Sequence, residues 1–419
     1  MKQQTVIGFG GAFTDSTGIN IKSLPQKTQT HLLDSIFSEK GAQYSICRVP
    51  IGGTDFSTRG YTYDDEHEDD IDLQYFALQP EDYKYKIPYI QKALQLTNNS
   101  LKLFGSPWNA PLWMKTNNKF SGVGFLKDQY YQVWANYFLK FFESYAKEGI
   151  QFWGVTTQNE PFDGFIPNFL SKVNAMGFTV RQTNKWVGQH LGPTIRNSNF
   201  SNLKIMLFDD NRQTLISFPL TLNNDEVLKY ADGVAIHWYA DFVLPDSLLK
   251  NTRTDKKDLF LINTEACNGY LSSTGIEKAV DLGSWSRAEI YLNSIFNDFQ
   301  YGAGGWLDWN IVLNEQGGPT YVSNFVDASI IVKNSTGEFF KQPMHYIMAH
   351  FSEYIILDSV KIHTTKLKNL RTMAFLRPDN LTAVIIYNPD SSDTNVQIDT
   401  KYGSIVIDVE AHSLNTVLF

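Results

Sequence analysis

Cysteine is scarce in this chain of 419 residues, which has only Cys47 and Cys267. Two cysteines cannot build the disulfide framework of a small secreted domain. Each lies in an apolar, strand-like stretch, so we expect two reduced and buried thiols. Clusters of metal ligands are also missing, because HExxH and HxH do not occur and the 8 histidines are scattered. We therefore expect no metal site and no cofactor.

Basic residues form no block, and the chain carries a net charge of -8. A nucleic-acid-binding protein needs a basic patch that neutralises phosphates, so nucleic acid is not an expected partner. No apolar run approaches the ~20 residues of a membrane-spanning helix, and the first residues contain no apolar segment of a signal peptide. We expect no transmembrane segment, and the compartment stays open.

Two common catalytic motifs are missing as well. The sequence has no GxSxG nucleophile elbow and no P-loop, which argues against a serine hydrolase and against a nucleotide hydrolase. Aromatic residues, by contrast, reach 14%, with 9 Trp, 21 Tyr and 29 Phe. Most of these rings must belong to the core, but the excess favours a ligand with flat, apolar faces.

Eight short apolar runs recur along the chain up to residue 310. Each run is continuous rather than alternating, which is typical of strands that are covered on both faces. Segments with helical periodicity lie between most of the runs, as at residues 28–42, 128–149 and 275–299. The runs are TVIGFGG from Thr5, YSICRVP from Tyr44, LKLFGSPW from Leu101, FWGVTTQNEP from Phe152, LKIMLFDDN from Leu203, GVAIHWY from Gly233, LFLINTEAC from Leu259 and GGWLDWN from Gly304.

Eight such strand and helix units predict an α/β fold, the (β/α)8 TIM barrel, whose typical size is ~250 residues with insertions beyond. A doubly wound sheet is the structural alternative. Its GxGxxG fingerprint is incomplete here, because Phe13 stands where GFGGAF should carry its third glycine.

The residue pattern changes at about Val360, where short segments of alternating apolar and polar residues are separated by Pro, Asp, Asn and Ser. They predict a small antiparallel domain that resembles a β-sandwich. A module of this size is marginal alone, so it should dock on the barrel. We place the catalytic barrel at residues 1–355 and the β-rich C-terminal domain at residues 356–419.

Polar side chains gather where the predicted strands end, which is where barrel enzymes carry their active sites. Glu160 ends the fourth run and Glu265 the seventh. They are separated by about three units of roughly 35 residues each, so they should face one another across the barrel mouth. Other strand ends carry Arg48, Trp108, Asn159, Asp209, Asp210, Arg212, His237, Tyr239 and Trp309.

Two carboxylates that flank a pocket are what glycoside hydrolysis requires, because one protonates the leaving oxygen while the other meets an oxocarbenium-like carbon. Aromatic rings suit the apolar faces of sugars, and Asp, Asn and Arg suit their hydroxyls. Two alternatives stay open at this point. The glutamates could belong to a structural ion-pair network with Arg48 and Arg212, or the barrel could bind carbohydrate without turnover.

Long strings of the chain resemble glycoside hydrolase family 30, in its glucosylceramidase branch. They run in order from the first residues to about Met344, and the β-rich tail fits as well. The matching strings are GFGGAFTD, RVPIGGTDFSTRGYTY, SPWNAPLWMKTN, QFWGVTTQNEP, VAIHWY, TEAC, GSWSR, GGWLDWNIVLNEQGGP and NFVDASIIV.

The resemblance implies a role for each of ten residues. Glu160, in an Asn-Glu-Pro motif, looks like the general acid/base, and Glu265, in Thr-Glu-Ala-Cys, looks like the nucleophile. Arg48 and His237 look like groups that orient the nucleophile. Substrate contacts and cleft positions are implied for Asp55, Trp108, Asn159, Tyr239, Trp309 and Asn324.

The resemblance also implies the reaction: a retaining β-glucosidase that hydrolyses glucosylceramide-type β-glucosides to glucose and ceramide, with possible peripheral contact to lipid. A β-xylosidase or another β-glycosidase of the family is the alternative. Retention predicts carboxyl groups ~5 to 5.5 Å apart, whereas inversion needs ~6.5 to 9.5 Å. It also predicts a raised pKa for Glu160, and donors such as Arg48 that keep Glu265 ionised.

Two departures from the family accompany the resemblance. Family members normally carry several tens of residues before the GFGGA strand, whereas Met1 stands seven residues before Gly8. We expect a truncated chain or a reduced β domain. The signal peptide of secreted or lysosomal family members would lie in the missing part, so its absence here leaves the compartment unknown. The second departure is residues 162–178, which match poorly. They should form a loop beside the cleft that influences aglycone preference.

Overall fold

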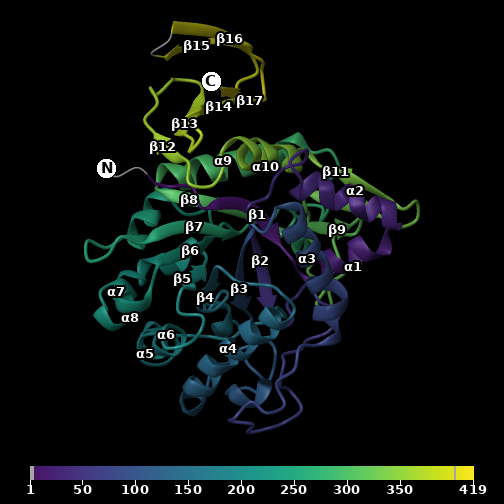
Figure 1. Cartoon of the computed structure of the whole chain (residues 1–419), viewed down its shortest axis with the longest axis vertical. Helices are drawn as coiled ribbons and strands as arrows, with labels where there is room; N and C mark the ends of the chain where they lie inside the picture. Colours follow the sequence, from purple (N-terminus) through teal and green to yellow (C-terminus); the bar gives the residue numbers. More distant parts are fainter. Residues whose placement is uncertain (1–3, 401–402) are drawn as a thin grey trace.

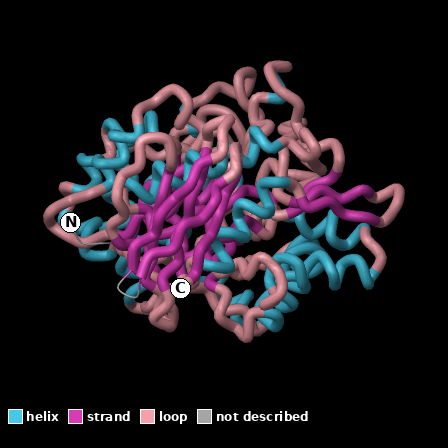
Figure 2. Tube along the Cα trace, turned by 90° about the horizontal axis from the view of Figure 1, so that it is seen from above, coloured by secondary structure: helices cyan, strands magenta, loops and turns pink. Residues whose placement is uncertain are grey.

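The computed structural model describes residues 4–400 and 403–419. Eight parallel strands close into a barrel in the order of the sequence, which confirms the predicted (β/α)8 class. Figure 2 shows the strands gathered in the middle of the molecule with helices and loops around them. The strands are β1 (Gly8–Ala12), β2 (Ile46–Ile51), β3 (Lys102–Pro107), β4 (Gly154–Thr156), β5 (Lys204–Asp210), β6 (Gly233–His237), β7 (Phe260–Glu265) and β8 (Ala303–Asn310).

The barrel interior is filled by apolar side chains that meet from strands on opposite sides. A cluster separate from the outer core joins Ile46 of β2, Met206 of β5 and Leu307 of β8, and such a contact is possible only inside the barrel. The neighbouring strands come close enough to exclude side chains at one point: a Cβ on Gly10 would lie 1.8 Å from the carbonyl oxygen of Ile46. The continuous apolar runs therefore reflect burial on both faces.

Ten α-helices of the described residues lie mostly outside the barrel, with α4 to α8 at one end in Figure 1 and α9 and α10 near the other. The predicted helix over 128–149 is confirmed as α4. The helix predicted over 28–42 begins earlier and ends at Phe37. The helix predicted over 275–299 begins only at Trp285, because the backbone of Gly283 is left-handed (φ 78°). The helices are α1 (Asp15–Ser23), α2 (Gln26–Phe37), α3 (Ile87–Leu96), α4 (Tyr131–Lys147), α5 (Val180–Trp186), α6 (Gly192–Arg196), α7 (Pro219–Leu222), α8 (Asp225–Tyr230), α9 (Trp285–Gln300) and α10 (Pro343–Tyr354).

After α10 the chain forms the predicted antiparallel β domain, drawn in yellow-green to yellow in Figure 1. A four-stranded sheet has the order β12-β13-β14-β17, and β15 and β16 form a separate pair. The strands are β12 (Val360–Ile362), β13 (Arg371–Leu376), β14 (Thr382–Asn388), β15 (Thr394–Thr400), β16 (Gly403–Val409) and β17 (Ser413–Leu418). Three further strands, β9 (Val312–Asn314), β10 (Ile330–Lys333) and β11 (Glu338–Lys341), form a small sheet beside the barrel.

Alternation along β13 explains how the β domain docks. Phe375 belongs to the main core and stacks edge-on against Phe299 of α9 at 5.8 Å, whereas its neighbour Ala374 belongs to a second cluster with Val396 and Val409 of the β15–β16 pair. Side chains of a strand point alternately to its two faces. The four-stranded sheet is therefore covered by barrel helices on one side and by the strand pair on the other.

Both cysteines are buried and free, as the sequence predicted. Cys47 lies within β2, whereas Cys267 lies two residues beyond the end of β7, at the barrel mouth rather than inside a strand. Within the described part of the chain, no helix has the length and apolar character needed to cross a membrane. The first three residues lie outside the described ranges.

Candidate active site

A cavity of about 220 Å³ opens at the carboxyl ends of the barrel strands. Seven of the ten predicted site residues line it: Asp55, Trp108, Glu160, Tyr239, Glu265, Trp309 and Asn324. The other three, Arg48, Asn159 and His237, are buried and bond to residues that line the cavity or to one another.

The two glutamates lie close together in this cavity. Glu160 follows β4 after a short extension, and Glu265 is the last residue of β7. A carboxylate oxygen of each lies within 4.8 Å of the other. Inversion requires a gap of ~6.5 to 9.5 Å, in which a water molecule stands between the carboxyl group and the sugar, so this spacing matches retention.

Glu265 is held by donors at both of its oxygens. Arg48 Nη1 donates to Oε2, and the Tyr239 hydroxyl donates to Oε1 at 2.8 Å. The same hydroxyl lies 3.3 Å from the Cys267 sulfur. Burial raises the pKa of Glu265, while the charges of His237 and Arg48 oppose that rise. Because both oxygens accept hydrogen bonds, the ionised form of Glu265 is the one that this arrangement holds.

Arg48 donates hydrogen bonds to four side chains in the polar network around the glutamates. It is fully buried, and its guanidinium lies 4.6 Å from the Trp108 ring and 5.4 Å from the Trp309 ring. Burial alone would lower the pKa of Arg48, but its two carboxylate partners reverse that effect. The guanidinium donates to Ser106 (2.9 Å), Asn159 (2.7 Å), Asp209 (2.8 Å) and Glu265.

Arg212, the other arginine considered from the sequence, does not contact the glutamates. It forms ion pairs with Asp241, Asp246 and Asp298 instead. A structural ion-pair network around the glutamate pair therefore contains Arg48 but not Arg212. Such a network and a catalytic role are compatible, because a buried nucleophile needs a donor that keeps it charged.

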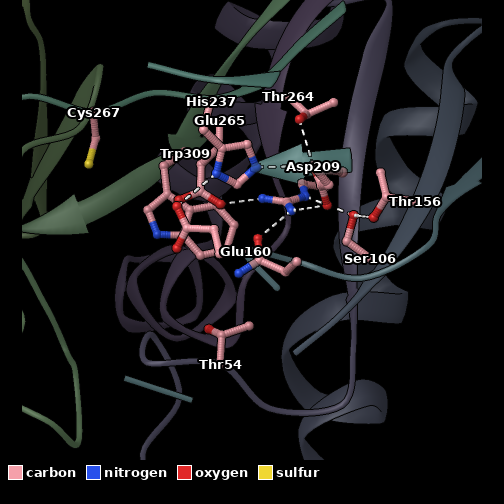
Figure 3. A network of polar contacts seen from close by, with 12 residues as sticks. Thr54, Ser106, Thr156, Glu160, Asp209, His237, Thr264, Glu265, Cys267 and Trp309 are labelled. Carbon is pink, nitrogen blue, oxygen red and sulfur yellow. Dashed lines mark hydrogen bonds and ion pairs between the residues drawn. The ribbon is translucent and has the colours of Figure 1, made fainter. Parts of the chain in front are cut away.

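His237, at the end of β6, bridges two carboxylates. Nδ1 lies 2.9 Å from Glu160 Oε1, and Nε2 lies 3.0 Å from Asp209 Oδ1 (Figure 3). Burial alone would lower its pKa, but Glu265, Asp209 and Glu160 together raise the pKa of His237 to about 10. The residue is therefore cationic at neutral pH. Its contacts correct the expectation that it orients the nucleophile, since it bonds to Glu160 and not to Glu265.

The cation at His237 changes the acidity of Glu160. Burial would raise the pKa of Glu160, but the hydrogen bond and charge of His237 outweigh burial, and Asn211 Nδ2 also donates to Oε1 at 2.8 Å. The net effect is a lowered pKa for Glu160. The prediction of a raised pKa for Glu160 is therefore wrong. The reason is that His237, which the sequence analysis assigned to Glu265, bonds to Glu160.

The backbone around Glu160 and Asp209 is irregular. Glu160 has φ 37° and Asp209 has φ 55°, both in the left-handed region that costs non-glycine residues energy. A bulge lies between Phe208 and Asp210 where β5 pairs with β6. It turns Asp209 toward Arg48 and His237, and it turns Asp210 to accept a hydrogen bond from the Phe162 N–H at 3.0 Å.

The remaining predicted contacts divide into two groups. Trp108 and Trp309 stack at 5.2 Å in the cavity, and the Asn324 amide donates to Asp55 at 2.7 Å. Burial raises the pKa of Asp55 to about 7, opposed by that hydrogen bond. Asn159 differs, because its oxygen accepts from Arg48 and it does not line the cavity. Asn159 is thus better placed to hold Arg48 than to meet a ligand through that oxygen.

Glu160, His237 and Glu265 also form the one group of three possible metal ligands found among residues 4–400 and 403–419. Their chemistry does not favour a divalent cation. His237 is already protonated between two carboxylates, and the buried guanidinium of Arg48 bonds to Glu265. A further positive charge here would meet two cations in a site of low dielectric.

The chain matches family models over nearly its whole length. Residues 6–355 match the glycosyl hydrolase family 30 TIM-barrel domain, and residues 358–417 match the glycosyl hydrolase family 30 beta sandwich domain. The chain belongs to glycoside hydrolase family 30.

Two relatives of this family 30 chain share the same sequence identity with it. It is 41% identical to putative glucosylceramidase 4 of Caenorhabditis elegans, over 99% of the chain and 81% of the relative. It is also 41% identical to lysosomal acid glucosylceramidase of Mus musculus, over 100% of the chain and 82% of the relative. Among solved structures, SrfJ from Salmonella typhimurium superposes with a TM-score of 0.89 at 26% identity, covering 100% of this chain and 90% of that one.

Sequence reasoning about this family 30 chain missed several residues at the site. Asp209 was noted only as a strand end, although it bonds to Arg48, His237 and Thr264. The sequence feature that could have indicated it is the Asp-Asp pair at the end of the fifth apolar run. In the structure a bulge points the two side chains toward different partners. Asp163 and Asn211 also line the cavity, and neither carried a signal of its own.

Proposed function

We propose that this chain is a retaining β-glucosidase that hydrolyses glucosylceramide-type β-glucosides to glucose and ceramide. The observation that carries the reaction is the close approach of the Glu160 and Glu265 carboxylates inside the cavity. The choice of substrate is supported by the relatives, which are named glucosylceramidases and match almost the whole chain.

In the first step, ionised Glu265 attacks the anomeric carbon and forms a covalent glycosyl-enzyme. Glu160 gives a proton to the glycosidic oxygen as the bond to the aglycone breaks. Arg48 and Tyr239 hold the attacking carboxylate in place through its two oxygens. The stacked Trp108 and Trp309 offer an apolar wall to the sugar.

In the second step, water attacks the same carbon from the side that the aglycone has left. Glu160 takes the proton from that water, so the residue that was the acid becomes the base. The bond between Glu265 and the sugar breaks, and glucose leaves with its original configuration. Asp55 and Asn324, which bond to each other in the cavity, are proposed contacts for the sugar hydroxyls.

Glu160→Ala should lose activity according to the leaving group. Hydrolysis of a phenyl β-glucoside should fall by about 100-fold to 10,000-fold, because its leaving oxygen needs the proton. A dinitrophenyl β-glucoside needs no proton to leave, so its glycosyl-enzyme should form and then persist, since no base activates water. Added azide should attack this intermediate and restore turnover, giving a β-glucosyl azide. Absence of azide rescue would contradict the role of Glu160.

A direct test of the proposed function compares substrates. The purified chain is assayed with glucosylceramide, with aryl β-glucoside and with aryl β-xyloside, and ceramide and glucose release are measured. We expect both glucosides to be hydrolysed and the xyloside to be slower. A preference for xyloside would favour the alternative within the family. Failure of a cyclitol epoxide to label Glu265, together with sugar binding and no turnover, would favour a carbohydrate-binding barrel.

A lipid substrate would bring the barrel mouth to a membrane surface, and exposed apolar side chains support this finer proposal. They occur in the segments that follow β4, β5 and β6, and the ring of Phe242 lies 6.4 Å from the ring of Tyr270, which lines the cavity. Anionic lipid vesicles should therefore increase the hydrolysis of glucosylceramide more than that of a soluble glucoside. The side chains are Phe162, Phe165, Phe169, Leu170, Ile216, Leu220, Phe242 and Val243.

A further inference from the structure

The hydroxyl group of Tyr239 lies between the nucleophile and a thiol. It donates to Glu265 Oε1 at 2.8 Å, and it lies 3.3 Å from the sulfur of Cys267. All three side chains line the cavity. Pairing with β8 continues beyond the end of β7, because the Trp309 N–H donates to the Ala266 carbonyl at 2.7 Å. The backbone that carries Glu265 therefore also fixes the position of Cys267, two residues later.

Tyr239 is held in place through both its backbone and its ring. Its N–H donates to Asn211 Oδ1 at 3.0 Å, and its ring packs against that of Tyr270 at 5.1 Å and a steep angle of 66°. The hydroxyl proton can still rotate about the bond from oxygen to the ring. Its direction therefore depends on the two groups beside the oxygen, Glu265 and Cys267.

The hydrogen bonds in the series Cys267–Tyr239–Glu265 have one consistent direction. An ionised carboxylate only accepts, so the single hydroxyl proton of Tyr239 must point toward Glu265. The Tyr239 oxygen can then only accept from Cys267, which makes the thiol the donor. Cys267 is buried, and burial raises the pKa of its thiol well above the usual range, so the thiol keeps its proton.

We propose that Cys267 is a positioning residue of the nucleophile: its thiol donates to the Tyr239 oxygen and so keeps the Tyr239 proton on Glu265. Without this donor, the Tyr239 hydroxyl would be a weaker and less well directed donor to the carboxylate. No proton moves along the series, and Cys267 forms no bond to the sugar. This inference rests on the proposed retaining function, because it supports the same nucleophile.

Packing alone is the competing explanation for Cys267. The residue belongs to an apolar cluster with Trp108 and Trp309, where a thiol can act as a small hydrophobic side chain. The two explanations predict opposite orders for two substitutions. Ala suits an apolar cluster but removes the donor, whereas Ser keeps a donor but places a hydroxyl group in the cluster. The better substitute therefore distinguishes a donor from a packing residue.

The pKa of Glu265 supplies a readout that packing alone would not move. Burial raises this pKa, the charges of His237 and Arg48 lower it, and the hydrogen bond from Tyr239 lowers it as well. Weakening that hydrogen bond while the charges stay in place should therefore raise the pKa of Glu265. The charged groups that act on Glu265 are Arg48 of β2, Asp55 beyond β2, Glu160 beyond β4 and His237 of β6.

The experiment measures kcat/KM against pH with dinitrophenyl β-glucoside. Its leaving group needs no proton, so the acid limb of the profile follows the ionisation of Glu265. Cys267→Ala should move that limb up by about 0.5 pH unit or more, which lowers kcat/KM below the limb about 3-fold or more. Cys267→Ser should stay within about 0.2 pH unit of the unchanged chain. An unmoved limb in Cys267→Ala, or a larger shift in Cys267→Ser, would overturn the role of Cys267.

Two further variants test the route through Tyr239. In a Tyr239→Phe background, Cys267→Ala should cause no additional shift of the limb, because the connection to Glu265 is already lost. An additional shift as large as that in the unchanged background would contradict the proposal. Cys47→Ala is the matched control, since Cys47 is buried in β2 and belongs to the main core rather than to the cavity. Its acid limb should equal that of the unchanged chain.

Infrared spectroscopy of the S–H stretch gives a readout that needs no activity. The chain has two cysteines, so Cys47→Ala leaves one band, that of Cys267. Donation to Tyr239 lowers the frequency of this band, and Tyr239→Phe should raise it. If that band does not move while β-glucosides are hydrolysed, the role of Cys267 falls and the proposed function stands. If the band moves but no β-glucoside is hydrolysed, the proposed function falls, and with it the nucleophile that Cys267 would position.

Discussion

Glu265→Gln is expected to lower kcat for aryl β-glucosides by about 10,000-fold or more, because no other group can form the covalent intermediate. The amide has nearly the same shape, so it can stay between Arg48 and Tyr239. Binding of glucose-like inhibitors should therefore change much less than kcat. Steady-state kinetics and inhibitor titration with the same preparation measure the two effects.

Glu143→Gln is the matched control for this substitution. Glu143 is exposed on α4, away from the cavity, and the same chemical change there should leave kcat unaltered. Mass spectrometry after treatment with a cyclitol epoxide supplies a second readout: the control should be labelled at Glu265, and Glu265→Gln should not be. Residual activity above about 1% in a preparation free of other glucosidases would assign the nucleophile elsewhere.

The barrel could be predicted because its signal is repeated eight times. Runs such as GVAIHWY and LFLINTEAC begin with several consecutive apolar residues and do not alternate, which is typical of strands that are covered on both faces. A single run of this kind is ambiguous, but eight in succession with helical segments between most of them leave few folds. The C-terminal domain could be predicted for the opposite reason: Phe375 and Ala374 face different layers, so its strands alternate.

Helix ends were harder to predict, because they depend on single backbone angles. The periodicity over 275–299 continues through Gly283, yet that glycine is left-handed and α9 starts only afterwards. In the same way, the helix predicted over residues 28–42 ends at Phe37 in the structure. Periodicity records which residues can face the core, and it does not record where the chain turns.

The candidate site could be predicted at strand ends but not beyond them. Glu160 and Glu265 were found because barrel topology places these ends in one cavity. The partner of His237 was not found, since a bulge in β5 and a left-handed Glu160 decide which carboxylate it meets. Asp163 lies in a short 3-10 helix beyond β4, where strand periodicity does not predict the direction of its side chain, and only the structure shows that it lines the cavity.

Arg48→Met should destabilise the chain by about 3–5 kcal/mol, because it leaves the buried carboxylate of Glu265 without its ion-pair partner and leaves Asp209 with His237 alone. Both ion pairs are closed to solvent: the Arg48 and Asp209 side chains are 0% exposed, and that of Glu265 is 7% exposed. Activity should fall as well, since Glu265 loses one of its two donors. Urea unfolding gives the free energy of unfolding, and kinetics in the absence of urea gives the loss of kcat.

Lys256→Met is the control that shows whether burial causes the loss of stability expected for Arg48→Met. Lys256 pairs with Asp225 at 2.8 Å, but their side chains are 45% and 83% exposed, so the pair should contribute no more than about 1 kcal/mol. Arg48→Lys should fall between the two, because it keeps the charge but cannot reach four acceptors at once. If Arg48→Met were as stable as Lys256→Met, the carboxylates would be protonated or solvated in the folded chain. The ionised nucleophile would then need another source of stabilisation.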